Sequence, residues 1–452
     1  MLFVKYIWKI NRRPLFFGGI HPRENKQLTK NKPVQDMPLL ETYHVPLKQH
    51  IGEACVPMVK PGEKVFKGQK IACATPAKSA IIHSPVSGMV TDIGMHRDAV
   101  AGSAQCITIK SDGKDEWLPG LLVKRSYLML GKEDMLEIVR DCGVVGMGGA
   151  AFPCHTKLSP PSNKTIDMLV INGAECEPYL TSDYRLMLEH GDEVIRGCLI
   201  AMIILGVSQC SIGIEDNKKE AITLLREKVQ GTAVKIIALP TIYPQGGEKM
   251  LIKAMCNREV PSGKLPMDVG CVVHNVSTMK ALSDAIEKNI PLIERIVTVS
   301  GSSIKNPLNV RVRIGTPFSD VIEFCGGIRE DVASILMGGP MMGIAQSDAC
   351  APVVKACSSI LAFSKKEIHE PAESACIRCG KCIDVCAMRL RPYMLSILSE
   401  QRKYQTALLD FDLLDCIECG CCSYVCPAKR NIVQYVRLAK AKNTLINKSA
   451  RK

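Results

Sequence analysis

The sequence lacks any long apolar segment. Its longest apolar run, residues 198–207, has about half of the ~20 residues that a membrane-spanning helix needs. The first residues, MLFVKYIWKINRR, mix charges with aromatic side chains and contain neither a long hydrophobic region nor a small-residue cleavage site. We therefore expect neither a secretory signal nor a transmembrane helix, and any membrane association should be peripheral.

The sequence also lacks the cysteine spacing of a disulfide scaffold, although it contains 22 cysteines. Nine of them fall between residues 376 and 426, and eight of these nine have the spacing of metal ligands. Exposed thiolates in such runs need a reducing compartment. This pattern argues against a disulfide-rich secreted protein and predicts a cytoplasmic location.

The chain of 452 residues is too long for one hydrophobic core. Residues 42–110 alternate short β-rich runs with glycine and proline, which is typical of a small all-β module. Residues 127–288 alternate helical stretches with apolar strands, which predicts βαβ units around a parallel sheet whose strand ends bind a nucleotide or flavin. Residues 294–327 return to β-strands followed by a short helix, and both cysteine runs come after them.

The two cysteine runs share the spacing C-x-x-C-x-x-C-x-x-x-C. Thiolates are soft donors that match iron, and a tight loop directs three of them at one face of an iron–sulfur cube. In bacterial two-cluster ferredoxins, the fourth cysteine of each run binds the other cluster. We therefore expect two 4Fe-4S clusters, one held by Cys376, Cys379, Cys382 and Cys426, the other by Cys416, Cys419, Cys422 and Cys386.

Neighbouring residues refine this pattern. Gly380 and Gly420 stand at matching offsets in the two runs and ease the turns of the loops. Cys421 interrupts the repeat and is expected to be a buried thiol beside a cluster rather than a ligand. The fourth cysteine of the second run is followed by a proline, Pro427. In the first run, Ala387 stands at the same position in place of proline, but this change removes no ligand. A zinc site is the alternative, and two interlocked four-thiolate runs disfavour it.

A glycine-rich segment, GMGGAAFPCHTK, spans residues 146–157. Glycine lets a phosphate approach the backbone amides closely, and the lysine at its end adds positive charge. A tight helix-packing turn would explain these glycines equally well. Three further elements follow along the chain: NGAECEP from residue 172, GGEK from residue 246 and NVST from residue 275.

Taken in this order, the four elements resemble the FMN- and NADH-binding flavoprotein subunit of respiratory complex I. The resemblance implies FMN contacts from Gly146, Gly148, Gly149, Lys157, Asn172, Asn275 and Thr278, stacking of the nicotinamide on Phe152, and NADH contacts from Gly246 and from Glu175, Glu177 or Glu248. Carboxylates suit ribose hydroxyls and would repel a 2′-phosphate, which favours NAD over NADP. The second element reads Gly246-Gly247-Glu248, so the paired acid that is common in complex I is reduced to one. No catalytic side chain is expected, because the flavin carries the chemistry.

The order of the modules resembles the C subunit of the Rnf electron transport complex, and this resemblance covers nearly the whole chain. The segments GGIHPRENKQLT and NGAECEPYLTSDYRLM are close to signatures of that family. It implies a multidomain α+β protein with six parts: an N-terminal extension (1–41), a lipoyl-like β barrel-sandwich hybrid (42–120), a Rossmann-like α/β FMN/NADH domain (121–290), a soluble-ligand-binding β-grasp module (291–345), an α-helical two-cluster 4Fe-4S ferredoxin domain (346–436) and a basic tail (437–452).

The resemblance further implies a peripheral subunit on the cytoplasmic side of the cell membrane, in a complex that couples electron flow between ferredoxin and NAD to ion translocation. Its expected partners are NAD(H), other subunits of the complex, including an iron–sulfur or flavin subunit, and ferredoxin as an indirect electron partner. Two clusters near −2 each and a flavin phosphate near −2 would reduce the formal net charge of +13 to about +7. Lipid headgroups or an acidic partner could bind to this remaining positive charge. No nucleic acid partner is expected.

Other readings stay open at this point. One is a flavin-free electron relay, and another is a non-redox scaffold with structural clusters. Cobalamin reductase flavoproteins share the modules but place the barrel-sandwich part late in the chain. Lys78 lies near the hairpin tip where lipoyl domains carry a modified lysine, but its neighbours differ and an unmodified adaptor is favoured.

The two ends of the chain are basic. The last residues, KAKNTLINKSARK, are expected to be frayed or bound to a surface rather than packed. Basic residues at both ends either contact lipid headgroups or remain solvated: Lys5, Lys9, Arg12, Arg13, Lys440, Lys442, Lys448, Arg451 and Lys452.

Overall fold

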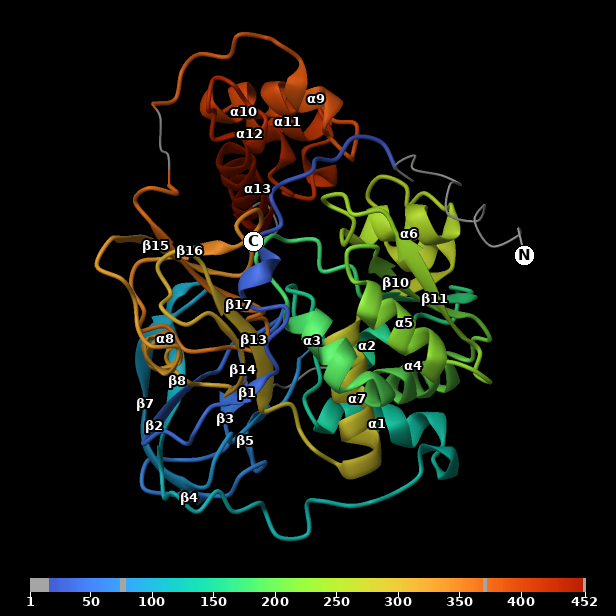
Figure 1. The fold of residues 1–452 in the computed structure, drawn as a ribbon, viewed down its shortest axis with the longest axis vertical. Helices are drawn as coiled ribbons and strands as arrows, with labels where there is room; N and C mark the ends of the chain where they lie inside the picture. The colour runs from blue at the N-terminus through green and yellow to red at the C-terminus, as the bar shows by residue number, and fades with distance from the viewer. Residues whose placement is uncertain (1–15, 74–78, 369–371, 450–452) are drawn as a thin grey trace, which may run out of the picture.

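The computed structural model of the chain describes residues 16–73, 79–368 and 372–449. Figure 1 shows the helices of the cysteine-rich part at one end of the molecule, with the β-rich modules and the helix-covered parallel sheet below them. Lys78 and the basic residues of the first fifteen positions lie outside the described residues. Within the described part of the chain, no helix is both long enough and apolar enough to span a membrane.

The first module is all β. Its larger sheet has the order β2(Thr42–Pro46), β8(Gly102–Ser111), β7(Gly88–Asp98) and β4(Lys64–Val65). A smaller sheet has the order β3(Val56–Pro57), β5(Lys70–Cys73) and β6(Ile82–His83). Alternate residues such as Val45, Ile107 and Ile109 are fully buried between the two sheets, because successive side chains of a strand point to opposite faces.

The second module contains a four-stranded parallel sheet, as the alternation of strands and helices predicts. Its strand order is β11(Val234–Leu239), β10(Cys210–Glu215), β9(Met168–Asn172) and β12(Cys271–Asn275). The helices of this module are α1(Lys132–Asp141), α2(Cys154–Lys157), α3(Ser182–Glu189), α4(Gly191–Leu205), α5(Lys219–Lys228), α6(Glu248–Cys256) and α7(Val276–Lys288), with short 3-10 turns η3(Tyr127–Met129) and η4(Pro266–Val269).

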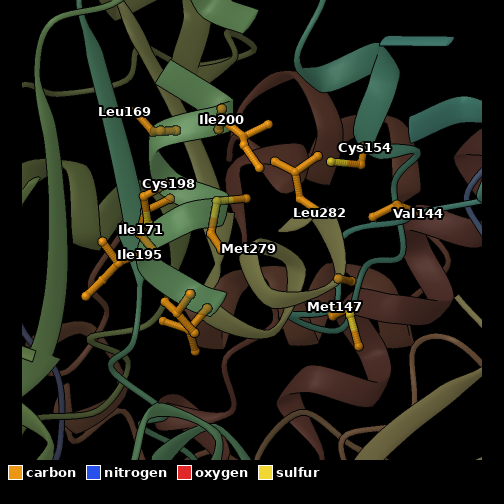
Figure 2. Close-up of a cluster of buried hydrophobic side chains, with 14 of the residues drawn as sticks. Val144, Met147, Cys154, Leu169, Ile171, Ile195, Cys198, Ile200, Met279 and Leu282 are labelled. Atoms are coloured by element: carbon orange, nitrogen blue, oxygen red, sulfur yellow. The ribbon is translucent and has the colours of Figure 1, made fainter. Parts of the chain in front are cut away.

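Helices cover both faces of this parallel sheet. Leu169 and Ile171 pack into the large core beneath α4 and α7, part of which is drawn in Figure 2. Val170, which lies between them in the sequence, packs on the opposite face with Leu251 and Ile252 of α6. Because β9 is buried on both faces, its sequence is the continuous apolar run MLVI and does not alternate between apolar and polar residues.

The third module is built on a six-stranded sheet. Its strand order is β1(Gln35–Asp36), β14(Leu308–Arg313), β13(Glu294–Ser300), β17(Ser359–Ser364), β15(Val332–Met337) and β16(Ile344–Gln346), with helix α8(Phe318–Phe324) packed on it. The sheet therefore extends beyond the expected span of 291–345. Strand β17 lies between β13 and β15, and all six of its residues are buried. Strand β1 joins the edge in parallel with β14, so the N-terminal segment contributes to the sheet.

The cysteine-rich module is helical. It contains α9(Lys381–Asp384), α10(Pro392–Glu400), α11(Tyr404–Leu409), η5(Leu413–Asp415), α12(Cys421–Tyr424) and α13(Ile432–Ser449). Gly380 and Gly420 precede α9 and α12 with φ angles of 80° and 82°, so both glycines serve the turns as expected. The expectation that the chain is frayed from residue 440 is wrong for the first part of that segment. Helix α13 continues through it, and Asn443 is buried against the module.

The N-terminal segment before β1 is built into the fold rather than attached to its surface. It contains the short turn η2(Lys26–Leu28). Ile20 exchanges two backbone hydrogen bonds with Tyr243, and the amide of Gly19 donates to the carbonyl oxygen of Val385 at 3.0 Å. This segment therefore contacts the parallel-sheet module and the cysteine-rich module at once.

One close contact in the core gives a direct test of the fold. Helices α4 and α7 pack so closely at Gly197 that an added Cβ would collide with the carbonyl oxygen of Met279. Gly197→Ala should therefore destabilise the protein by about 2 kcal/mol or more, although alanine is the better helix former. For a module of this size, the melting temperature should fall by about 4 °C or more in scanning calorimetry.

Gly191→Ala is the matched control in the same helix. Its added Cβ would meet only the flexible ends of Leu225 and Lys228 at 3.0–3.4 Å. This variant should melt within about 2 °C of the wild type. Equal melting temperatures for the two variants would contradict the described packing of α4 on α7.

Candidate functional site

The candidate flavin residues gather at the carboxyl end of the parallel sheet. Asn172 and Asn275 are the last residues of the neighbouring strands β9 and β12, and they lie opposite each other in register. The glycine-rich segment closes over this edge, where the amide of Met147 donates to Thr278 Oγ1 at 2.9 Å. A Cβ added to Gly148 would lie 3.3 Å from the side chain of Asn275. Elements far apart in the sequence thus meet at one edge.

The glycine-rich segment forms an open turn. The amide of Gly146 donates to the carbonyl oxygen of Phe152 at 2.8 Å, which closes the base of the turn. Gly149 near the tip has a φ of 115°, and a Cβ added there would meet no atom within 4 Å. Its backbone therefore borders free space, as a loop that receives a phosphate requires. This open turn is the observation that fits FMN best.

The second glycine element lies beside the first. Asn172 Nδ2 donates to the carbonyl oxygen of Gly246 at 2.9 Å, and the amide of Gly246 donates to Cys176 Sγ at 3.2 Å. Lys157, at the end of α2, forms an ion pair of 2.8 Å with Glu248 at the start of α6. The positive and negative side chains expected at the site are therefore neighbours, and both are partly exposed.

The two acids of the NGAECEP element have different surroundings. Glu175 Oε1 accepts a hydrogen bond from the amide of Asp183 at 2.7 Å, while Oε2 is buried and has no hydrogen-bond partner among the described residues. Glu177 accepts hydrogen bonds from the amides of Met341 and Met342 at 3.0 and 2.9 Å. Burial raises the pKa of both carboxyl groups to about 7. Glu177 is thus engaged by the loop between β15 and β16, whereas Glu175 Oε2 is buried and lacks a hydrogen-bond partner among the described residues.

A buried lysine holds the backbone of this element. Lys26 Nζ donates to the carbonyl oxygens of Glu175, Glu177 and Leu180 at 2.9, 2.8 and 2.6 Å. Burial lowers the pKa of Lys26, and the nearby positive charge of Lys218 lowers it further. Lys26 belongs to the GGIHPRENKQLT segment quoted above, but nothing in that segment alone shows which backbone it anchors.

Four of the expected cluster cysteines line one cavity in the cysteine-rich module. They are Cys386, Cys416, Cys419 and Cys422, and they form the ligand set expected for one cluster. The remaining wall is largely apolar, with Leu390, Leu395, Ile432, Val433 and Val436. Soft sulfur donors around an apolar cavity are the surroundings that a 4Fe-4S cluster needs. Among the described residues, no three His, Cys, Asp or Glu side chains are arranged to hold a single metal ion.

The other expected ligand set lies nearer to solvent. Cys382 and Cys422 belong to one small core, and Cys426 packs against it, so cysteines of the two runs lie close together. Cys376 is half-buried and Cys379 is exposed. Ile377, which directly follows Cys376, has 65% of its surface exposed, although it is a large apolar residue. The two ligand sets therefore differ in exposure despite their identical cysteine spacing.

We call the carboxyl end of the parallel sheet, with Asn172, Asn275 and the glycine-rich turn, the flavin edge. This flavin edge contacts the cysteine-rich module beside the cavity lined by the four cysteines. The Tyr243 hydroxyl donates to the carbonyl oxygen of Cys419 at 2.7 Å, and Cys421 Sγ lies 3.9 Å from the carbonyl oxygen of Tyr243. Lys249 of α6 pairs with Asp415 at 3.5 Å. Tyr243 lies only three residues before Gly246, so the same loop serves both sites. The YPQGGEK element contains Tyr243, yet its sequence gives no sign of this contact.

Four known domain families match the chain in the expected order. The RnfC barrel sandwich hybrid domain matches residues 15–114, and the Nuo51 FMN-binding domain matches residues 139–284. The SLBB domain matches residues 296–345, and the 4Fe-4S dicluster domain matches residues 375–430. These matches confirm the expected modules and their order.

A solved structure supports the fold alone. The NAD+-reducing [NiFe]-hydrogenase in the H2-reduced state is similar with a TM-score of 0.50 and 16% sequence identity. The match covers 70% of this chain and 63% of the hydrogenase chain. At this level of identity, the similarity concerns the arrangement of elements.

Whole proteins from two bacteria are similar over nearly their full length. The C subunit of the proton-translocating ferredoxin:NAD(+) oxidoreductase complex of Clostridium ljungdahlii is 51% identical, over 95% of this chain and 94% of that protein. The C subunit of the Na(+)-translocating ferredoxin:NAD(+) oxidoreductase complex of Acetobacterium woodii is 40% identical, over 94% of this chain and 96% of that protein. With these identities and the matching domains, the chain belongs to the RnfC family of ion-translocating ferredoxin:NAD oxidoreductase subunits.

Proposed function

We propose that this chain is the subunit of an ion-translocating ferredoxin:NAD(+) oxidoreductase complex that exchanges electrons with NAD(H). When bound, FMN supplies the conversion between two-electron hydride transfer and one-electron transfer. The observation that carries the proposal is the shared interface, because Tyr243 joins the loop of the flavin edge directly to Cys419. The names of the two relatives and the matched FMN-binding and 4Fe-4S dicluster domains support the same function.

We assign the flavin phosphate to the open glycine-rich turn. The backbone at Gly149 borders free space, and Lys157 lies at the same edge of the sheet. Lys157 would divide its charge between the phosphate and Glu248. The loop and the strand ends would be held around the flavin by Gly146, Gly148, Asn172, Asn275 and Thr278.

NADH would bind beside the flavin edge, with Phe152 stacking on the nicotinamide. Glu175 and Glu248 are the carboxylates best placed for the ribose hydroxyls, because Glu175 Oε2 has no other partner among the described residues and Glu248 is partly exposed. Glu177 has a different role. Its two hydrogen bonds to the amides of Met341 and Met342 fix the β-grasp module against the flavin edge.

We propose an order for the two clusters. The cluster of Cys386, Cys416, Cys419 and Cys422 is proximal to the flavin, because its cavity adjoins Tyr243. The cluster of Cys376, Cys379, Cys382 and Cys426 is distal and exchanges electrons with a partner subunit at the exposed surface of Ile377 and Cys379. The complex would hold this chain as a peripheral protein on the cytoplasmic side of the membrane.

The central test uses the purified chain, prepared anaerobically with iron, sulfide and FMN. Addition of NADH should bleach the flavin absorbance and then reduce the clusters, which absorbance and electron paramagnetic resonance (EPR) spectra follow separately. NADPH serves as the matched control and should react much more slowly, because Glu175 and Glu248 would repel its 2′-phosphate. Flavin and clusters that both remain oxidised in NADH would contradict the proposed function.

The interlocked ligand sets make a second prediction. Cys426→Ser should remove the same cluster as Cys376→Ser, although residue 426 belongs to the second cysteine run. Cys416→Ser should remove the other cluster. Iron content and the EPR spectrum of each variant identify the cluster that is lost. The matched control is Cys325→Ala, a buried thiol of the β-grasp core, which should retain both clusters. Loss of the same cluster in the Cys416 and Cys426 variants would refute the exchange of fourth ligands.

The flavin phosphate assignment makes a third prediction. Lys157→Met should weaken FMN binding by about tenfold or more, since a hydrogen bond to a charged group contributes about 1.5–3 kcal/mol. Equilibrium titration of the flavin-depleted protein measures this change. Lys164→Met is the matched control, because Lys164 pairs with Asp268 and should not affect FMN affinity. Unchanged FMN affinity in the Lys157 variant would place the phosphate elsewhere.

A further inference from the structure

A cleft lies between helix α7 and the segment that leads into strand β13. It has a volume of about 270 Å³. One wall is a single face of α7 from Ser277 to Lys288, because the lining residues of this helix recur at helical spacing. The facing wall is formed by residues 290–296, and Trp117 also lines the cleft. Since α7 rises by about 16 Å between Ser277 and Lys288, the cleft extends along the helix away from the flavin edge.

Much of the cleft surface is apolar. Its apolar side chains come from three separate segments and include Leu186, Ala281, Ile290, Leu292 and Ile296. Ligand sites in proteins typically combine such walls with a small number of polar groups that fix the orientation of the ligand. The cleft therefore has room for an apolar body, and its charged side chains decide which polar group the ligand carries.

The acidic side chains of the cleft already have basic partners. Three ion pairs account for them: Glu193–Arg196 at 3.3 Å, Asp284–Lys280 at 2.7 Å and Glu294–Arg311 at 3.9 Å. Lys288 shares Asp284 at 2.9 Å. Arg295 also lines the cleft, and it is the one Lys or Arg there that forms no ion pair with any described residue. The cleft thus contains a positive charge without a counter-charge.

Arg295 is held in place by neutral groups. Only 3% of its surface is exposed. Nη1 donates to the carbonyl oxygen of Lys355, and Nη2 donates to that of Met147 at 3.1 Å, while Nε has no partner among the described residues. These bonds use two of the five N–H groups of the guanidinium. The side chain is therefore fixed in orientation and keeps unused donors.

The acid closest in effect to Arg295 is engaged elsewhere. The charge of Asp183 acts on Arg295, but the carboxylate oxygens of Asp183 accept hydrogen bonds from Asn275 and Ser277 at 2.7 and 2.6 Å. A buried charge is costly when no opposite charge and no full set of hydrogen bonds compensates it. An anion bound in the cleft would supply both.

The planar guanidinium presents parallel N–H groups that match the oxygens of a carboxylate or a phosphate. We propose that the cleft is a binding site for a small organic oxyanion, whose carboxylate or phosphate group binds Arg295 and whose apolar body lies along α7. This inference does not depend on the proposed function, because it requires neither electron transfer nor the clusters.

The test is a calorimetric titration of the FMN-loaded protein with phenyl phosphate and with benzoate. At least one of them should bind, and the tighter of the two identifies the oxyanion that the cleft prefers. Benzyl alcohol, which has the ring but no charge, should not bind. Arg295→Met should weaken binding by about tenfold or more, since it removes hydrogen bonds to a charged group. Arg258→Met is the matched control, because Arg258 pairs with Asp167 outside the cleft.

A second variant guards against loss of folding in Arg295→Met. Ala281→Leu narrows the cleft from α7 and leaves Arg295 intact, so it should also weaken binding. The inference is overturned if neither anion binds the wild type, or if either variant binds it as tightly as the wild type does. Release of FMN by the anion, seen in the flavin absorbance, would also overturn it, because the anion would then occupy the flavin site. The reaction with NADH tests the proposed function separately.

Discussion

The arrangement of this protein depends on the contact between Tyr243 and Cys419. Tyr243 is buried, exchanges backbone hydrogen bonds with Ile20, and donates its hydroxyl to the carbonyl oxygen of Cys419. A buried hydroxyl is costly unless it is hydrogen-bonded, so this contact specifies one seating of the cysteine-rich module on the parallel-sheet module. Electron transfer between a flavin and a cluster needs such a fixed seating, and here one loop provides both the flavin edge and the seat.

The N-terminal segment also holds the backbone beside the flavin edge, through the buried side chain of Lys26. A buried ammonium group is tolerated only when its donors are satisfied, and Lys26 uses its three donors on the carbonyl oxygens of Glu175, Glu177 and Leu180. This fixes the backbone that carries both acids. The side chains then diverge. Glu177 binds the β-grasp loop, while Glu175 remains beside the flavin edge with one carboxylate oxygen free of described partners. Under the proposed function, Glu177 thus serves domain assembly and Glu175, two residues earlier, serves ligand recognition.

Local sequence patterns predicted the parts of this architecture that depend on local chemistry. The cysteine spacing indicated the thiols that share a cavity, and apolar runs separated by helices indicated the parallel sheet. Long-range contacts carry no such signal. Strand β17 lies about 60 residues from its partner β13, and β1 consists of only two residues, so neither could be assigned to the sheet from its own sequence. The engagement of Glu177 by residues 341–342 was unpredictable for the same reason, because it depends on how two modules meet.

The duplicated cysteine motif shows how the fold gives two ligand sets of equal spacing unequal surroundings. One cavity is enclosed by apolar side chains and adjoins Tyr243, while the other set includes the exposed Cys379 beside the exposed Ile377. Burial and sulfur hydrogen bonds both affect cluster potentials, so two sites with the same thiolates need not have the same potential. Since only one ligand set touches the flavin edge and only the other has an exposed cysteine among the described ligands, the proposed order of the two clusters rests on where the fold places each run, and not on the ligands themselves.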